Sequence, residues 1–276
     1  MLKLLACIFM LLDHIGFYFD AMLPPSIVML LRTVGRLAFP IFAWHVARGY
    51  SRTRKVHIYF LRMAAFAIVS EFIIRYANSL AGYNLPGTNV LVTFALSIVL
   101  LAGYQMARYS WRDMVAGLRP VTAANGTAPI KPVARFNVRV NLGGIELDPR
   151  VGLPLGTLMM FLALLTAIWL QPDYDVYGML TVLFFYIAID KHDDVEWEKR
   201  IWRLLIPLNL LYMIYRIINI PGIAAWAVIQ LFSLLAIPLC LLKPNDKKPP
   251  AWAKYAFYLF YPLHILALAG IKFLLS

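Results

Sequence analysis

The chain has 276 residues, of which 62% are hydrophobic and only 14% are charged. A water-soluble domain cannot bury that much apolar surface, and apolar runs of about 18 residues or more recur along the chain, as in helical membrane proteins. The formal net charge of +12 comes mainly from Lys and Arg between these runs. It therefore indicates membrane orientation and gives no support for nucleic-acid binding.

Nine apolar segments are predicted to cross the bilayer as α-helices, because a helix satisfies its own backbone hydrogen bonds in hydrocarbon. They cover residues 4–20, 27–49, 57–76, 90–109, 151–170, 176–190, 201–218, 222–242 and 255–275. No small-residue cleavage site follows the first segment, so we expect it to be a span and not a removable signal peptide. We therefore predict an all-α, polytopic transmembrane bundle in which residues 1–276 form a single domain.

Lys and Arg are distributed unequally between the connecting segments. With the N-terminus in the cytoplasm, 21 of the 26 Lys and Arg residues fall on the cytoplasmic side. The connections on the other side contain none: 21–26, 77–88, 171–175 and 219–221. This asymmetry predicts a cytoplasmic N-terminus and a C-terminus on the opposite side.

Residues 110–150 are too polar to span the membrane and are expected to form a cytoplasmic insert. Within the insert, ARFNVRVNLGGIEL alternates polar and apolar residues before a Gly-Gly turn, which predicts a small β-hairpin. Its basic face suits either contact with phosphates or simple solvation at the surface.

Several ionisable residues lie inside the predicted spans, where each is costly unless it has a partner or water. Counting about 1.5 Å per residue from the nearest cytoplasmic Lys or Arg places His14, His264 and Arg36 at a similar depth, about 15–18 Å. Asp13 points about 100° away from His14 on the same helix, so we expect it to pair with Arg36. Glu71 is a further candidate for this level or a partner for an arginine. The group forms either a functional site or a buried structural hydrogen-bond cluster.

Two prolines lie beside this polar level. Pro40 follows Arg36 by four residues and removes the amide that would bond the Arg36 carbonyl, which predicts a kink in the second span. Pro262 precedes His264 by two residues and perturbs the ninth span in the same way. Such kinks favour a cavity at that depth.

A histidine at mid-membrane depth suits general-base activation of an amine or hydroxyl, and equally a proton relay in a transporter. The sequence contains no nucleotide-binding loop, nucleophile elbow or HExxH motif. Cys7 and Cys240 lie in apolar runs outside any CxxC or His/Cys cluster, so we predict neither a disulfide nor a metal site.

Five blocks of the sequence extend this interpretation. They are MLLDHIG (10–16), RTVGRLAFPIFAWHVARGYSRTRK (32–55), NVLVTFAL (89–96), DYDVYGMLTVLFFYI (173–187) and KYAFYLFYPLHILAL (254–268). In this order they resemble the signature of the TraX family of membrane proteins. The insert at 110–150 departs from the family pattern and leaves the identity of the substrate open.

TraX proteins are linked to N-terminal acetylation of conjugative pilin subunits, and they are similar to wider groups of membrane acyltransferases that use acetyl-CoA and an intramembrane histidine. The resemblance implies a multi-pass protein of the bacterial inner membrane, with acetyl-CoA as acyl donor, no metal, and a pilin subunit or surface glycan as acceptor. It implies that His14 is the catalytic base, that Asp13 is its electrostatic companion, and that Arg36 stabilises charge on the thioester carbonyl.

The matched blocks add further candidates. Asn89, Tyr177 and His264 are expected to line the site. Arg52, Arg54 and Lys55 are expected to hold the phosphates of acetyl-CoA, although membrane topology alone also explains a basic cluster there. Two other functions remain open: a proton-coupled transporter or flippase that uses the same buried residues, and a non-catalytic assembly protein of the cell envelope.

Overall fold

The computed structural model describes residues 2–117, 148–190, 196–242 and 251–275. Its helices are α1 (Leu2–Tyr18), α2 (Pro25–Gly35), α3 (Ala38–Arg52), α4 (Val56–Leu80), α5 (Val90–Gly117), α6 (Pro149–Leu170), α7 (Asp175–Asp190), α8 (Trp197–Asn219), α9 (Ala224–Ile229), the 3-10 helix η1 (Gln230–Leu235), α10 (Ala236–Leu241) and α11 (Ala251–Leu275). The described residues form no strand beyond one isolated bridge between Thr88 and Pro172. The all-α prediction is confirmed for this part of the chain, and the predicted hairpin lies outside it.

Six stretches of helix are long and apolar enough to cross a membrane, so the chain is a multi-pass membrane protein. They are Pro25–Arg52, Val56–Leu80, Val90–Val115, Pro149–Leu170, Trp197–Asn219 and Tyr255–Leu275. The other three predicted spans are also helical but shorter. Helix α1 has 17 residues and α7 has 16, and residues 222–242 divide into α9, η1 and α10.

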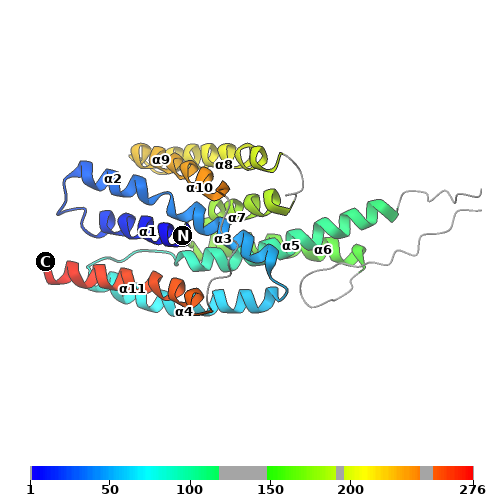
Figure 1. The fold of residues 1–276 in the computed structure, drawn as a ribbon, viewed down its shortest axis with the longest axis horizontal. Helices are drawn as coiled ribbons and strands as arrows, with labels where there is room; N and C mark the ends of the chain where they lie inside the picture. The colour runs from blue at the N-terminus through cyan, green and yellow to red at the C-terminus, as the bar shows by residue number, and fades with distance from the viewer. Residues whose placement is uncertain (1, 118–147, 191–195, 243–250, 276) are drawn as a thin grey trace, which may run out of the picture.

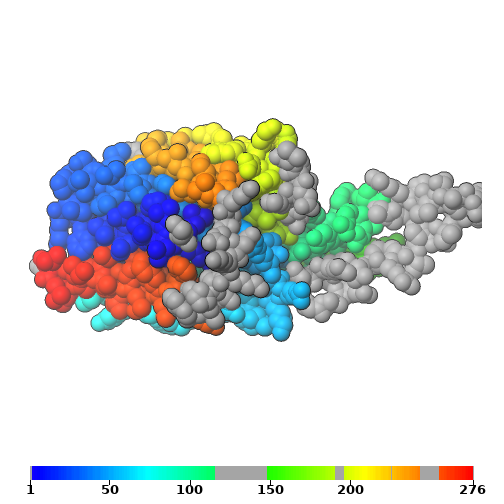
Figure 2. Space-filling view, viewed as in Figure 1, coloured from blue at the N-terminus to red at the C-terminus, as the bar shows by residue number. Residues whose placement is uncertain are grey.

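The helices run roughly along the long axis of the molecule (Figure 1). Helix α1 packs against α2, α3 and α11, and α3 packs against α7. Helices α5 and α6 pack along each other and extend past the other helices at the end of the molecule opposite α2 and the C-terminal end of α11 (Figures 1 and 2). This arrangement surrounds the polar part of α1 with helices on several sides.

The outer helices present large apolar side chains to their surroundings. Phe72 of α4 is 72% exposed, Trp169 of α6 is 80% exposed and Ile218 of α8 is 74% exposed. Met179 and Phe185 of α7, in contrast, are fully buried. Exposed apolar surface of this extent marks a face that contacts lipid.

The second predicted span is interrupted beside its arginine. Helix α2 ends at Gly35 and α3 begins at Ala38, so Arg36 and Leu37 separate the two helices. Pro40 lies in the first turn of α3 and has no amide hydrogen to donate to the Arg36 carbonyl. The missing hydrogen bond explains why the helix is interrupted here, where a kink was predicted. In contrast, α11 continues as one helix through Pro262.

Candidate functional site

Two glycines bring α1 and α2 into close contact. A Cβ atom at Gly35 would collide with Cα, Cβ and Oδ1 of Asp13, and one at Gly16 would lie 3.0 Å from Cβ of Leu31. Small residues of this kind let membrane helices approach closely. As a result, the carboxylate of Asp13 lies directly beside the C-terminal end of α2.

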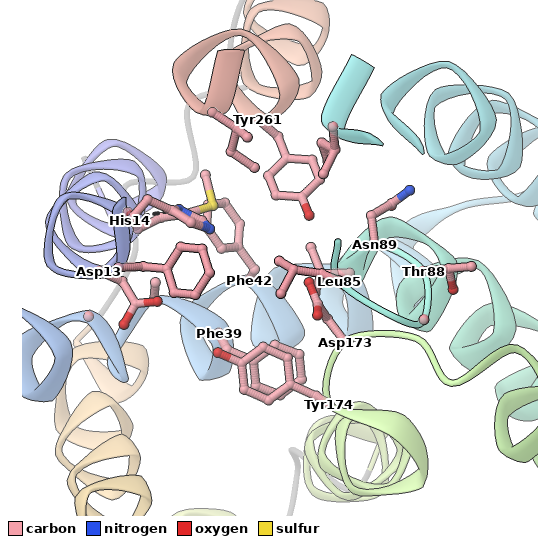
Figure 3. Close-up of a pocket in the computed structure, with 18 of the residues that line it drawn as sticks. Asp13, His14, Phe39, Phe42, Leu85, Thr88, Asn89, Asp173, Tyr174 and Tyr261 are labelled. Atoms are coloured by element: carbon pink, nitrogen blue, oxygen red, sulfur yellow. Dashed lines mark hydrogen bonds between the residues drawn. The ribbon is translucent and has the colours of Figure 1, made fainter. Parts of the chain in front are cut away.

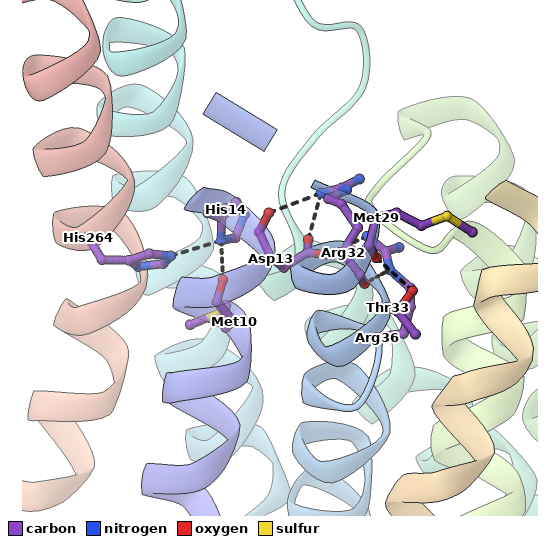
Figure 4. Close-up of polar contacts among 8 residues, drawn as sticks. All are labelled: Met10, Asp13, His14, Met29, Arg32, Thr33, Arg36 and His264. Carbon is purple, nitrogen blue, oxygen red and sulfur yellow. Dashed lines mark hydrogen bonds and ion pairs between the residues drawn. The ribbon is translucent and has the colours of Figure 1, made fainter. Parts of the chain in front are cut away.

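Asp13 forms two ion pairs across this contact (Figure 4). Its Oδ2 is 2.8 Å from Nη1 of Arg32, and its Oδ1 is 2.7 Å from Nη2 of Arg36. The structure thus brings together the predicted pair Asp13 and Arg36. Arg32 was not predicted, although the spacing of four residues from Arg36 puts both guanidinium groups on one face of the helix.

His14 and His264 form a hydrogen-bonded pair (Figure 4). Nδ1 of His14 is 2.9 Å from the carbonyl oxygen of Met10, and Nδ1 of His264 is 2.7 Å from that of Phe260. A carbonyl oxygen only accepts hydrogen bonds, so these contacts assign the proton of each neutral ring to Nδ1.

This assignment decides which nitrogen of His14 is basic. Nε2 of His264, which lies 3.0 Å from Nδ1 of His14, has a free lone pair and accepts a hydrogen bond from His14. Nε2 of His14 then carries the remaining lone pair and accepts no hydrogen bond from the described residues. His14 is therefore oriented through one nitrogen and available as a proton acceptor through the other.

The site is a central cavity of about 310 Å³ (Figure 3). Its walls come from α1, α2, α3, α4, α5, α8, η1 and α11, together with the segments before α5 and α7. The predicted residues that line it are Asp13, His14, Arg36, Glu71 and Asn89. His264 contacts His14 from α11 without being among the lining residues.

Glu71 and Asn89 hold one wall of the cavity together. The backbone amide and Nδ2 of Asn89 donate to Oε2 of Glu71 at 2.9 and 2.8 Å, and Oε1 of Glu71 is 2.7 Å from Nε of Arg75. Nδ2 of Asn89 also donates to the carbonyl of Ala67, and its Oδ1 accepts from the amide of Leu91. Because these groups are all occupied, this pair positions the segment before α5.

Tyr177 lies behind the cavity and not on its surface. Its hydroxyl donates to Oδ1 of Asn209 at 2.9 Å and accepts from Nε2 of Gln230 at 3.2 Å. Its ring stacks on Tyr212, with 4.1 Å between the ring centroids, and Tyr212 does line the cavity. Tyr177 thus supports the wall from α7.

Arg52, Arg54 and Lys55 lie at the connection between α3 and α4, and none of them lines the central cavity. Helix α3 separates them from the site. At about 1.5 Å per residue, the distance along this helix from Ala38 to Arg52 is about 21 Å. A ligand that contacts both places must extend along most of α3.

Asp173 lines the cavity and was missed by the sequence analysis (Figure 3). Its amide donates to the carbonyl of Thr88 at 2.9 Å, and its carbonyl accepts from the hydroxyl of Thr93. Gln171 and Tyr174, on either side of it, have positive φ angles of 46° and 67°. Such strained backbone in residues other than glycine is held by surrounding contacts and clusters at functional sites.

The surroundings of Asp173 favour its protonated form. The carboxyl group faces the cavity among crowded protein groups, and partial loss of solvation there raises its pKa from 3.8 to about 7. The negative charge of Glu71 adds to the increase in pKa. At neutral pH the group is therefore a hydrogen-bond donor for part of the time, facing the same space as His14 (Figure 3).

No group of three or more His, Cys, Asp or Glu side chains within the described ranges is arranged to hold a metal ion. Cys7 and Cys240 are both buried as free thiols. Among the residues that line the cavity, His14 and Asp173 carry side chains that can take up or release a proton.

Comparison with known proteins gives one match. A family model described as TraX protein matches residues 1–128 and 148–272. A search of curated proteins and a search of solved structures each found no match. All residues that line the central cavity lie within the matched ranges.

Proposed function

Because the chain belongs to the TraX family, we propose that it is a membrane-embedded acetyltransferase. It moves an acetyl group from acetyl-CoA to an amine or hydroxyl of a pilin subunit or a surface glycan, in the inner membrane of a bacterium. The observation that carries the proposal is Nε2 of His14, a nitrogen oriented by hydrogen bonds through Nδ1 and facing a cavity inside a membrane protein.

In the proposed reaction, Nε2 of His14 takes the proton of the acceptor N–H or O–H as the acceptor attacks the carbonyl carbon of the thioester. The carbon–sulfur bond then breaks, and the proton passes from His14 to the departing CoA sulfur. His264 accepts the hydrogen bond from Nδ1–H of His14 and stabilises the imidazolium that forms between these two steps. His264 is thus a positioning residue.

The negative charge that develops on the thioester oxygen needs preorganised donors. Arg36 supplies a guanidinium group whose orientation is held by Asp13 at 2.7 Å. Asp173 in its protonated form donates from the other side of the cavity (Figure 3). A neutral carboxylic acid is suited to this role because it donates a hydrogen bond without adding charge.

The donor is proposed to approach from the cytoplasm. Arg52, Arg54 and Lys55 bind the phosphates of acetyl-CoA, and the pantetheine arm extends along α3 toward His14. The basic charge of this connection supports the proposal, since guanidinium and ammonium groups are suited to phosphate. Holding the thioester and the acceptor in one enclosed cavity adds the benefit of proximity.

The test is acetyl transfer by the purified protein in detergent, with labelled acetyl-CoA and candidate acceptors. We expect His14→Gln to lower kcat by about 10²–10⁴-fold, the usual contribution of a general base. His45→Gln is the matched control, because His45 lies in α3 but does not line the cavity. Unchanged transfer by a folded His14→Gln protein overturns the proposal. Substrate movement without release of CoA indicates a transporter instead.

A further inference from the structure

A second cavity of about 280 Å³ adjoins the central one, and we call it the arginine cavity. It is formed by the ends of α1 and α8, by α2, and by α9 with the connection before it. Arg32, Arg36 and Arg216 line both cavities. The two cavities therefore meet at three guanidinium groups, and His14 lines the central cavity on the other side of this junction.

Positive charge exceeds negative charge at this junction. Asp13 pairs with Arg32 and Arg36, and Asp20, which lines the arginine cavity, accepts a hydrogen bond from the amide of Ala21. Arg216 packs over the ring of Tyr212 at 5.8 Å but has no carboxylate partner in the part of the chain that the structure describes. A half-buried guanidinium group without a counter-charge, beside two others, attracts an anion.

The arginine cavity lies at the end of the molecule predicted to face away from the cytoplasm. Arg216 is in the last turn of α8, and Ile223 and Trp226 follow the connection 219–221. Neither this connection nor 21–26, which joins α1 to α2, contains Lys or Arg. Figure 1 shows α2 and α9 at the same end as the C-terminal end of α11, far from the extension of α5 and α6.

We propose that the arginine cavity is the acceptor site, and that it takes an acceptor carrying a carboxylate or phosphate group from the non-cytoplasmic side. Arg216 holds this anionic group, because a guanidinium group binds both kinds of anion through two parallel hydrogen bonds. The nucleophile of the same molecule then reaches His14 past Arg32. The acceptor role rests on the proposed acetyltransferase, whereas the anion site does not.

The anion site is tested by thiol labelling, which needs no acetyl transfer. Ile223→Cys puts a thiol on the wall of the cavity in a background where the buried Cys7 and Cys240 are replaced by Ala. The reaction rate is measured with methanethiosulfonates that carry either a sulfonate or a trimethylammonium group, each normalised to its rate with a free thiol. Trp226→Cys serves as a second site if the first variant does not fold.

We expect the normalised rate to favour the sulfonate by about tenfold or more, as in clefts lined by charge of one sign. Arg216→Gln should lower this preference several-fold, and Arg216→Lys should keep most of it. Ser79→Cys, an exposed position in the last turn of α4 at the same end of the molecule, is the control and should show little preference. Equal rates at Ile223→Cys, or no effect of Arg216→Gln, overturn the anion site.

Protection from labelling identifies the source of the anion. In vesicles of phosphatidylcholine, inorganic phosphate or succinate should slow the labelling of Ile223→Cys, because a soluble anionic acceptor occupies the same place. Protection only by phosphatidylglycerol in the vesicle assigns the site to a lipid headgroup and overturns the acceptor role. Labelling by impermeant reagent from the cytoplasmic side alone overturns the direction of access.

The outcome is separable from that of the proposed function. His14→Gln should leave the labelling preference unchanged, since His14 does not line the arginine cavity. If acetyl transfer proves absent while the sulfonate preference and its dependence on Arg216 remain, the anion site stands and the acetyltransferase fails. If acetyl transfer is present but the sulfonate preference is absent, the acetyltransferase stands and the proposed acceptor site is wrong.

Discussion

The basic residues at the two ends of α3 differ in burial and in their partners. Arg32 and Arg36 are 22% and 15% exposed and share the carboxylate of Asp13. Arg52 and Arg54, at the other end of α3, lie on the surface and do not line the cavity. A buried guanidinium needs a counter-charge and a surface one does not, so only the first pair makes the local structure depend on charge.

The largest expected effect is that of removing the shared counter-charge. Asp13→Ala leaves two guanidinium groups unpaired inside the protein, which typically costs about 3–5 kcal/mol in the free energy of unfolding. Arg54→Ala is the surface control and should change it by less than about 1 kcal/mol. Unfolding in detergent, followed by circular dichroism, measures both. Equal effects of the two substitutions contradict the contrast between the buried and the surface arginines.

The next effect concerns His264, which acts through His14. His264→Leu removes one of the two acceptors of Nδ1–H of His14 and leaves the carbonyl of Met10, so it should lower kcat by about 10–100-fold, at the low end of acid–base effects. His264→Gln keeps an acceptor oxygen and should restore most of the activity. The KM for acetyl-CoA should stay unchanged in both variants, because neither touches the donor. A fall in stability with no difference between Leu and Gln in kcat indicates a purely structural role.

A smaller effect is expected in the pH dependence of transfer. The pKa of Asp173 is raised from 3.8 to about 7, so its protonated, hydrogen-bond-donating form is lost as the pH rises through about 7. The same shift in pKa stabilises the folded protein. This contribution is fully present below pH 3.8 and is lost as the pH rises from there through about 7.

Asp173→Asn tests this expectation, because an amide donates a hydrogen bond at every pH. Wild-type kcat/KM should decline above pH 7 through loss of the donor, and the variant should lack this decline. Glu196→Gln, a change near the start of α8 outside the cavity, should leave the profile as in the wild type. Identical profiles for wild type and Asp173→Asn are incompatible with a donor role for Asp173.

The smallest expected effect is a change in the KM for acetyl-CoA on replacing the basic residues between α3 and α4. If Arg52, Arg54 and Lys55 bind the phosphates of acetyl-CoA, replacing all three by Gln should raise the KM for acetyl-CoA several-fold and leave kcat unchanged. The increase should shrink at high salt, because exposed charges are screened. An unchanged KM assigns these residues to membrane topology alone.

Much of the site follows from local properties of the chain. The rise of a helix and the cost of charge in hydrocarbon predicted that His14, His264 and Arg36 share one level, and the direction of neighbouring helical side chains predicted the pairing of Asp13 with Arg36. The structure contains the expected ion pair between Asp13 and Arg36, and it places His264 3.0 Å from His14. Pro40 predicted the break after Arg36 for an equally local reason.

Other features required the tertiary structure. Tyr177 was expected in the site because of its sequence block, but the rotation of α7 turns it toward Asn209 and behind Tyr212. Asp173 lies in a short connection whose sequence predicts only a turn. The positive φ angles of Gln171 and Tyr174 direct it into the cavity, and its backbone is held there by Thr88 and Thr93.

The sequence by itself therefore determined that the chain crosses the membrane several times and which family it belongs to, because hydropathy and sequence motifs are properties of the chain. Only the tertiary structure decided how the helices are rotated and how closely they approach. These choices bring Arg32 to Asp13, close the cavity around His14 and leave Arg216 without a carboxylate partner among the described residues, since each depends on contacts between residues far apart in the sequence.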